Sequence, residues 1–353
     1  MLIYPMIRLI KNYFSGEAAA VLHLPNFRRL LAFRFTMTMA TMMQSIVVGW
    51  HLYQLTGSVL ALGMIGIVEV IPQVSVSLFA GHYIDILDRQ KIIRYTSLLL
   101  FLGSGILVIY SIPSFRGYET FGTLPVYITF FITGFVRGIL MPAHTAFMGQ
   151  LVPRPLLANA ATWTSINWHI SAVAGPAAGG LIYGFFGITV AYIMVFLFYL
   201  ISFYLIGTVE KQGPVNQNAP RGKMKTNIAD GIRYVFNNPV LLGAFTLDMF
   251  AVLFGGAVAV LPAFAKDVLQ IGPQGLGFLR SCPAIGAIIM SFFLASFPPV
   301  KHTGRYLLAG VAGFGLCIIG FALSKVLFIS AFFLVLSGAC DNISVVIRQT
   351  ILQ

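Results

Sequence analysis

The sequence has 353 residues, of which 58% are hydrophobic and only 9% are charged, and its mean hydropathy is +0.89. A soluble domain is about a quarter charged, so this composition excludes a water-soluble globule and indicates a polytopic membrane protein. The apolar segments run for about 20 residues, the length of a membrane-spanning helix. They lack the short alternating pattern of outer-membrane strands, which excludes a β-barrel.

The formal net charge is +12. A basic balance is compatible with nucleic-acid binding, but it is also produced by the excess of Lys and Arg in the cytoplasmic loops of membrane proteins. The positions of the basic residues, given below, favour the second explanation, so we expect no nucleic-acid partner. The three cysteines, Cys282, Cys317 and Cys340, fall in predicted spans without metal-ligand spacing, and each is interpreted as a small hydrophobic residue.

In chain order, residues 1–25 are predicted to be an interfacial arm, with a frayed tail as the alternative. A basic, polar linker is predicted over 209–239, with a short amphipathic helix over 228–236. Ten membrane spans are predicted at about 30–52, 58–80, 92–111, 124–148, 158–182, 186–208, 240–265, 274–296, 305–323 and 327–350.

The basic residues gather on one side of these spans. With a cytoplasmic amino terminus, the other side carries only three, Arg116, Lys266 and Lys325. The cytoplasmic side then carries sixteen: Arg8, Lys11, Arg28, Arg29, Arg34, Arg89, Lys91, Arg94, Arg154, Lys211, Arg221, Lys223, Lys225, Arg233, Lys301 and Arg305. This asymmetry predicts that the amino terminus is cytoplasmic.

The two halves of the chain resemble each other weakly. Gly134 and Arg137 in the fourth span align with Gly338 and Asp341 in the tenth, an offset of 204 residues (338 − 134). Six spans, a basic linker and a second similar set are typical of a secondary transporter built from parallel repeats. A complete second repeat would end about 59 residues beyond Gln353 (208 + 204 − 353). Two further spans are therefore expected to be missing, and a natural ten-span chain is the alternative.

Three stretches resemble a known family. The first is the charged turn between spans two and three, where Gly81 is followed by Asp85, Asp88, Arg89 and Lys91. The second is Tyr-Gln-Leu-Thr-Gly-Ser over 53–58, followed by a Glu-x-x-Pro over 69–72. The third is Leu-Ala-Asn-Ala over 157–160, followed by tryptophans at 163 and 168 and by Gly-Pro-Ala-Ala-Gly-Gly over 175–180.

With these stretches the chain resembles the major facilitator superfamily, and within it the branch of macrolide-efflux and enterobactin-exporter permeases. The resemblance implies an all-α fold of two six-helix lobes, here 26–208 and an incomplete 240–353, with spans one, four, seven and ten lining a central cavity. It also implies that Asp85 caps a neighbouring span and that Arg89 pairs with acidic or carbonyl groups. Ile86 stands where the family's loop usually has Arg.

Charged residues inside spans are the candidate functional groups, because a charge in a bilayer needs a partner or a water-filled cavity. They are Glu69, Arg137, Asp248, Arg280, Asp341 and Arg348. One hypothesis is that Asp248 or Asp341 couples proton entry to substrate exit, with Arg137 as counter-ion. The alternative is a permanent ion pair that only fixes helix packing. Glu69, three residues before Pro72, is interpreted as either a gating or proton-binding group or a structural hydrogen-bonding group.

Other candidates surround these charges. Gly175, Pro176, Gly179 and Gly180 are interpreted as a packing face or a hinge of span five. Met39, Met43, Gln44 and Trp168 are candidates for the wall of the substrate cavity, and ordinary core filling is the alternative. His144 lies seven residues beyond Arg137 on the same face, where a lone histidine is more often a packed core residue.

No hydrolase, metalloprotease or P-loop motif is present. We therefore expect no catalytic residue, cofactor or metal, and an energy source in a proton or other ion gradient. The predicted function is proton-coupled efflux of a small organic compound, such as a siderophore or a drug. Import of an anionic nutrient and a transport-inactive truncated protein are the alternatives.

Overall fold

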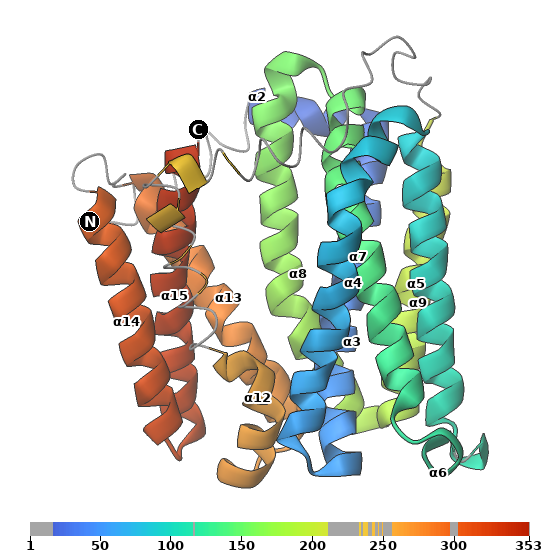
Figure 1. Cartoon of the computed structure of the whole chain (residues 1–353), viewed down its shortest axis with the longest axis vertical. Helices are drawn as coiled ribbons and strands as arrows, with labels where there is room; N and C mark the ends of the chain where they lie inside the picture. Colours follow the sequence, from blue (N-terminus) through green and yellow to red (C-terminus); the bar gives the residue numbers. More distant parts are fainter. Residues whose placement is uncertain are drawn as a thin grey trace. The chain divides into compact units, whose positions relative to one another are not determined.

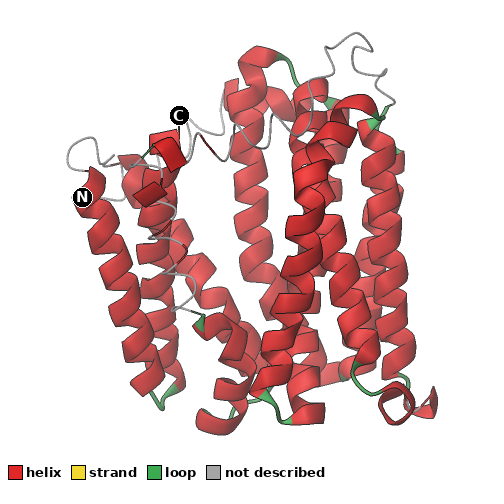
Figure 2. Cartoon of the chain, viewed as in Figure 1, coloured by secondary structure: helices red, strands yellow, loops and turns green. Residues whose placement is uncertain are grey.

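The computed structural model describes residues 17–115, 117–210, 256–296 and 303–352, together with isolated positions between 233 and 249 (Figure 1). Within these residues the chain is helical and contains no strand (Figure 2). The helices of the first part are α2 (Glu17–Ala20), η1 (Val21–His23), α3 (Pro25–Thr56), α4 (Val59–Ile86), α5 (Arg89–Ser111), η2 (Pro113–Phe115), α6 (Gly117–Phe121), α7 (Leu124–Leu151), η3 (Arg154–Leu156), α8 (Leu157–Phe186) and α9 (Ile188–Gly207). Those of the second part are α12 (Ala257–Ala263), η4 (Phe264–Val268), α13 (Pro273–Ser296), α14 (Thr303–Leu323) and α15 (Leu327–Leu352).

Eight of the described helices are long and apolar enough to cross a membrane: α3, α4, α5, α7, α9, α13, α14 and α15. They contain the predicted spans one to four, six and eight to ten. The predicted fifth span corresponds to α8, a 30-residue helix that carries Asn, Thr, Ser and His side chains and is not among the eight. The predicted seventh span, like most of the arm and the linker, lies largely outside the described residues. Ten spans and two missing ones therefore stay predictions.

Two of the helix connections depend on glycine. Gly57 and Gly187 have φ angles of +60° and +84°, in the left-handed region that side chains with a Cβ disfavour. Their N–H groups donate to the carbonyls of Tyr53 and Tyr183, each over 2.9 Å, which closes the last turns of α3 and α8. The chain reverses within one or two residues at each point, so long helices follow one another directly.

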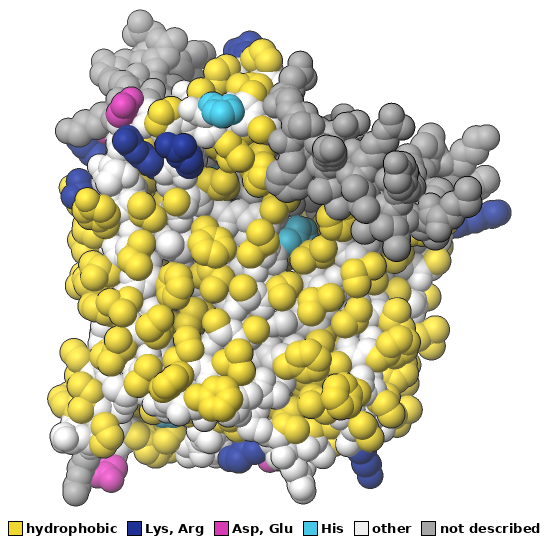
Figure 3. Space-filling view, turned by 180° about the vertical axis from the view of Figure 1, so that it is seen from behind, with side chains coloured by type: hydrophobic (Ala, Val, Ile, Leu, Met, Phe, Trp, Pro, Cys, Tyr) yellow, Lys and Arg dark blue, Asp and Glu magenta, His cyan; other side chains and the backbone are white. Residues whose placement is uncertain are grey.

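The chain divides into two compact units. Unit 1 comprises 1–41, 67–171 and 192–219, and unit 2 comprises 42–66, 172–191 and 220–353. Large side chains such as Phe27, Phe33 and Tyr199 are fully buried in unit 1, as are Met43 and Leu261 in unit 2. Many other apolar side chains are exposed, and they cover the face seen in Figure 3, with Lys and Arg near its upper and lower margins. Exposed apolar belts of this kind are typical of helices that face lipid.

The two glycines aligned in the sequence make equivalent contacts. In unit 1, a Cβ on Gly134 would overlap the carbonyl oxygen of Glu69 in α4. In unit 2, a Cβ on Gly338 would overlap the carbonyl oxygen of Pro283 in α13. In each unit, a helix therefore packs directly against the main chain of another through a glycine, as expected where small residues allow close approach.

Candidate functional site

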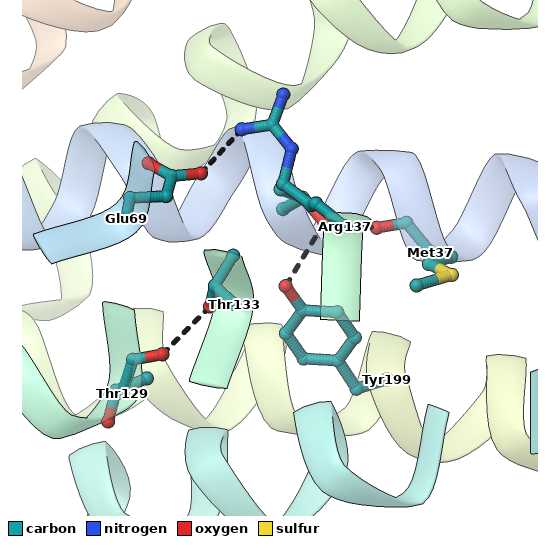
Figure 4. Close-up of polar contacts among 7 residues, drawn as sticks. Met37, Glu69, Thr129, Thr133, Arg137 and Tyr199 are labelled. Atoms are coloured by element: carbon teal, nitrogen blue, oxygen red, sulfur yellow. Dashed lines mark hydrogen bonds and ion pairs between the residues drawn. The ribbon is translucent and has the colours of Figure 1, made fainter. Parts of the chain in front are cut away.

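An ion pair joins α4 and α7 within unit 1. The Nη1 atom of Arg137 lies 2.5 Å from Oε1 of Glu69, and the two side chains point toward each other (Figure 4). The side chain of Glu69 is 17% exposed, whereas that of Arg137 is 45% exposed. The carboxylate is thus held inside, while the guanidinium keeps part of its surface open. Two of the predicted site residues come together here, in a combination that the sequence analysis did not pair.

Close packing of the two helices produces this pair. Gly134 lies against the main chain of Glu69, and Gly138 lies against that of Gln73, where a Cβ would come within 2.6 Å of the carbonyl oxygen. Both partners advance by four residues, so α4 and α7 run in the same direction. Arg137, one turn beyond Gly134, can then reach back to Glu69. Pro72 lies inside α4, three residues after Glu69, and has no N–H to donate within the helix.

A buried tyrosine ties α9 to α3 near the ion pair. The hydroxyl groups of Tyr199 and Thr41 are 3.1 Å apart, and the Thr41 hydroxyl donates to the carbonyl of Met37 over 3.0 Å. Tyr199, labelled in Figure 4, interacts electrostatically with both Arg137 and Glu69. A charge in a bilayer core costs about 3 kcal/mol or more unless it is paired. The Glu69–Arg137 contact keeps both charges in this largely apolar setting.

The charged turn between α4 and α5 binds main-chain groups. The carboxylate of Asp88 accepts from the N–H groups of Gln90 and Lys91 and so caps α5. Arg89 donates to the carbonyls of Ile84, over 3.3 Å, and of Ala146 on α7, over 2.9 Å.

The remaining members of this turn contribute less to the described contacts. Gly81 and Lys91 are exposed, and the space around Gly81 is open. The side chain of Asp85 lies outside the described residues, so the expected capping by Asp85 stays a prediction. The neighbouring Gln90, which the sequence analysis did not single out, donates to the carbonyl of Ile206 in the last turn of α9 and to that of Val209 just beyond it.

The small residues of α8 form a packing face within unit 2. A Cβ on Gly180 would overlap the carbonyl oxygen of Pro273, and one on Gly277 of α13 would come within 2.5 Å of that of Pro176. Gly179 lies against Met43 of α3, and Gly175 is buried. Ser281 on α13 donates to the carbonyl of Val173 over 2.7 Å. These contacts fit the packing interpretation of this segment.

A polar cluster at the end of α3 in unit 2 was not predicted. The hydroxyl of Tyr53 donates to the carboxylate of Asp267 in η4, and the Nζ of Lys266 lies 5.4 Å from the centre of the Tyr53 ring. Beside it, the hydroxyl of Tyr183 donates to the side-chain oxygen of Gln54 over 2.5 Å. The adjacent charges of Lys266 and Asp267 at a span boundary are the only sequence feature that could have indicated this cluster.

The other predicted site residues are placed as follows. Met39, Met43 and Gln44 are buried, with exposed fractions of at most 6%, whereas Trp168 is exposed and its ring meets that of His169 edge to face. Asp341 lies on an exposed position of α15. Asp248 and the side chain of Arg348 lie outside the described residues. Among the described residues, no group of three or more His, Cys, Asp and Glu side chains is placed to hold a metal ion.

Comparison with known proteins identifies the family. A model of the transmembrane secretion effector family, which belongs to the major facilitator superfamily, matches residues 17–352. An uncharacterized major facilitator-type transporter of Bacillus subtilis, YkuC, is 28% identical over 206 residues, which are 55% of this chain and 45% of that protein. The chain thus spans less than half of YkuC. Another uncharacterized transporter of this type from the same organism, YjbB, is 23% identical over 342 residues, 94% of this chain and 81% of that protein.

Solved structures show the same fold. An inward-facing bacterial homologue of the lysosomal transporter Spinster has a TM-score of 0.67 and 14% identity, covering 93% of this chain and 75% of that one. An inward-facing bacterial homologue of the iron transporter ferroportin has a TM-score of 0.65 and 14% identity, covering 94% and 85%. A D-xylose–proton symporter has a TM-score of 0.63 and 11% identity, covering 90% and 80%. The family and the fold are those of transporters rather than enzymes, and the chain belongs to the transmembrane secretion effector family of major facilitator superfamily transporters.

Proposed function

We propose that the protein exports small organic compounds, such as a siderophore or a drug, in exchange for protons. Transport would proceed by alternating access between two helical lobes, 26–208 and 240–353, joined by the linker 209–239. The amino terminus would face the cytoplasm of a bacterial cell, and the protein would lie in the inner membrane. The resemblance to macrolide-efflux and enterobactin-exporter permeases belongs to this proposal.

The Glu69–Arg137 ion pair is the observation that supports proton coupling. A carboxylate that is 17% exposed and sits inside a membrane-spanning helix has its charge stabilised by one guanidinium. If a proton binds Glu69, the ionic attraction is lost and Arg137 is released toward its exposed side. An anionic or strongly polar substrate that competes for Arg137 would in turn favour protonation of Glu69. Competition of this kind links proton binding to substrate binding.

The turn between α4 and α5 supports a conformational step. Arg89 links the end of α4 to the carbonyl of Ala146 on α7, so the same two helices that carry the ion pair are joined again at the turn. Movement of α4 against α7 would have to break these bonds. We therefore expect Asp85→Asn, in the same turn, to impair transport without preventing membrane insertion. Normal transport by that variant would reduce the turn to a marker of topology.

Coupling is tested with the purified full chain in proteoliposomes. An outward-directed substrate flux is measured with and without an imposed pH gradient, using a macrolide and a catecholate siderophore as probes, and internal pH is followed with a fluorescent dye. Glu69→Gln should abolish the stimulation by the gradient. Glu119→Gln, in the short helix α6 outside the spans, is the matched control and should retain it. Gradient stimulation in Glu69→Gln equal to that of the parent contradicts the role of this pair.

Parallel variants separate the other candidates. Asp248→Asn and Asp341→Asn test the two remaining carboxylates in predicted spans, and unchanged coupling in both would exclude them. The half-exposed guanidinium of Arg137 also favours a second function, import of an anionic nutrient together with protons. The sign of the flux decides between them, because an importer accumulates the anion inside vesicles of native orientation. Absence of flux with every probe in either direction would favour a transport-inactive protein.

A further inference from the structure

A buried histidine on α7 accepts a hydrogen bond from an arginine on α3, within unit 1. His144 is 5% exposed, and its Nδ1 atom lies 2.7 Å from Nη1 of Arg34. A guanidinium has only donors, so Nδ1 must be the acceptor. The imidazole is therefore neutral in this arrangement and carries its proton on Nε2.

The surroundings of this pair contain no compensating acid among the described contacts. Nε2 of His144 is buried without a hydrogen-bond partner, and within the described part of the chain no hydrogen bond or ion pair joins Arg34 or His144 to a carboxylate. Buried polar groups are normally satisfied, and the exceptions often have a function. An imidazole with one nitrogen committed to a cation and the other unpaired is such an exception.

The nearby charged groups on the packed helices are mostly cationic. On α7 itself, Arg137 lies seven residues earlier and is paired with Glu69 of α4. At the start of α5, Arg89 binds the carbonyl of Ala146, two residues beyond His144. On α8, which is joined to α3 by the bond from Asn167 Nδ2 to the Leu31 carbonyl, the titratable side chain of this stretch is His169.

We propose that His144 and Arg34 form a proton-binding site that joins α3 to α7 when the imidazole is neutral and releases them when it is protonated. A second proton on the ring must occupy Nδ1, where it points at the N–H of Arg34. Two donors and two like charges would then face each other at hydrogen-bonding distance. The contact cannot survive this change, so the protonated ring requires the guanidinium, and with it α3, to move away.

This inference rests on the proposed proton-coupled function and adds a site to it. Glu69 would bind a proton in competition with Arg137, whereas protonation of His144 would break the contact between α3 and α7. Each group pairs with a different arginine on a different helix. Proton binding would thereby act on α4–α7 at one point and on α3–α7 at another, two turns along α7.

The test measures the distance between α3 and α7 as a function of pH. Spin labels are placed at Ala32→Cys and Thr145→Cys, both exposed positions beside the pair, in the full chain with Cys282, Cys317 and Cys340 replaced by alanine. Distance distributions are recorded in lipid nanodiscs at pH 8 and pH 3, because burial and the neighbouring guanidinium oppose protonation of the ring. We expect the parent to show a longer distance at low pH. In His144→Gln, the amide oxygen can still accept from Arg34 but does not titrate, so the distribution should stay short at both pH values.

Further variants keep the result interpretable. Arg34→Gln removes the cation that opposes protonation and should also abolish the pH response, so it replaces His144→Gln if that variant does not fold. His169→Gln on α8 is the control and should keep the response. A pH response that persists in His144→Gln, or no response in the parent, overturns the proposal. The readout needs no transport, so loss of gradient-driven flux with an intact distance change would contradict the proposed function alone.

Discussion

The helix pairs α4–α7 in unit 1 and α13–α15 in unit 2 share one contact and differ in another. In both, a glycine of the later helix, Gly134 or Gly338, lies against a main-chain carbonyl of the earlier one. In α4–α7, the polar link near this contact is the ion pair of Glu69 and Arg137. In α13–α15, a neutral link is present, in which the amide of Asn342 donates to the hydroxyl of Ser291 over 2.9 Å.

The comparison separates packing from chemistry. Main-chain contact through glycine needs only the absence of a side chain, and it occurs in both halves of the chain. Charged side chains occur in both pairs, because α13 carries Arg280 and α15 carries Asp341. If both pairs only held helices together, a neutral hydrogen bond would serve as well as an ion pair, and would avoid placing two charges in a membrane. This cost is the reason for the proposal that the Glu69–Arg137 pair binds a proton or an anion.

The largest loss of stability should come from adding a side chain at the glycine contacts that both helix pairs share. In Gly134→Val and Gly338→Val, the new atoms meet a main-chain carbonyl that cannot rotate away, so the helices must separate. Overpacking a closed interior costs about 1–3 kcal/mol, and occasionally more; with main chain as the obstacle, we expect about 3 kcal/mol in each variant. The measurement is the thermal unfolding midpoint of the purified protein in nanodiscs. Gly63→Val is the control, because the space beside Gly63 is open. Equal midpoints for the three variants would refute the importance of these contacts.

The next effect should be confined to the ion pair. Arg137→Gln leaves the carboxylate of Glu69 without its cation in a membrane span. Removing one partner of a fully buried pair costs about 3–5 kcal/mol; because the Arg137 side chain is 45% exposed, we expect less, about 1–2 kcal/mol. The midpoint should fall, because the carboxylate of Glu69 is left without its partner. Arg154→Gln, at an exposed position in η3, should change nothing. An unchanged midpoint in Arg137→Gln would show that the ion pair contributes nothing to stability.

The double variant Glu69→Gln with Arg137→Gln should restore most of this stability. With both charges removed, neither group is left unpaired, and the two amides can bond each other, so we expect a net loss below about 1 kcal/mol. Transport driven by a pH gradient should nevertheless stay absent. Restored stability with restored transport would mean that the pair serves packing alone, which would erase the difference between the two helix pairs.

The sequence predicted the glycine contacts that the two helix pairs share better than it predicted their polar links. The alignment of Gly134 with Gly338 predicted two equivalent positions. A glycine in a membrane helix allows the main chain of a neighbouring helix to approach closely at that point. Arg137 was also recognised, since a charge in an apolar span is conspicuous. Its partner was not, because pairing with Glu69 depends on the register in which α4 lies against α7. Register is a property of packing, and no single helix encodes it.

The same limit explains the contacts that were missed. Arg89 acts on carbonyl groups, which any helix end supplies, so the type of contact could be expected from one residue. The bonds of Tyr53 to Asp267 and of Arg34 to His144 each need two particular side chains that are distant in sequence. His144 was interpreted from the sequence as a packed core residue, and its burial agrees with that. The guanidinium that faces it was visible only once α3 and α7 were placed side by side.

The smallest effect should appear at the neutral link. Ser291→Ala removes the acceptor of the Asn342 amide, which is 7% exposed, and a hydrogen bond of this type contributes about 0.5–1.5 kcal/mol. We expect a loss of about 1 kcal/mol in unfolding free energy, equal at pH 5 and pH 8, because neither group titrates. Ser77→Ala on α4, whose hydroxyl bonds only the Val74 carbonyl of its own helix, is the matched control. A pH-dependent loss in Ser291→Ala would contradict this, because it would show that the neutral hydrogen bond is coupled to a titrating side chain.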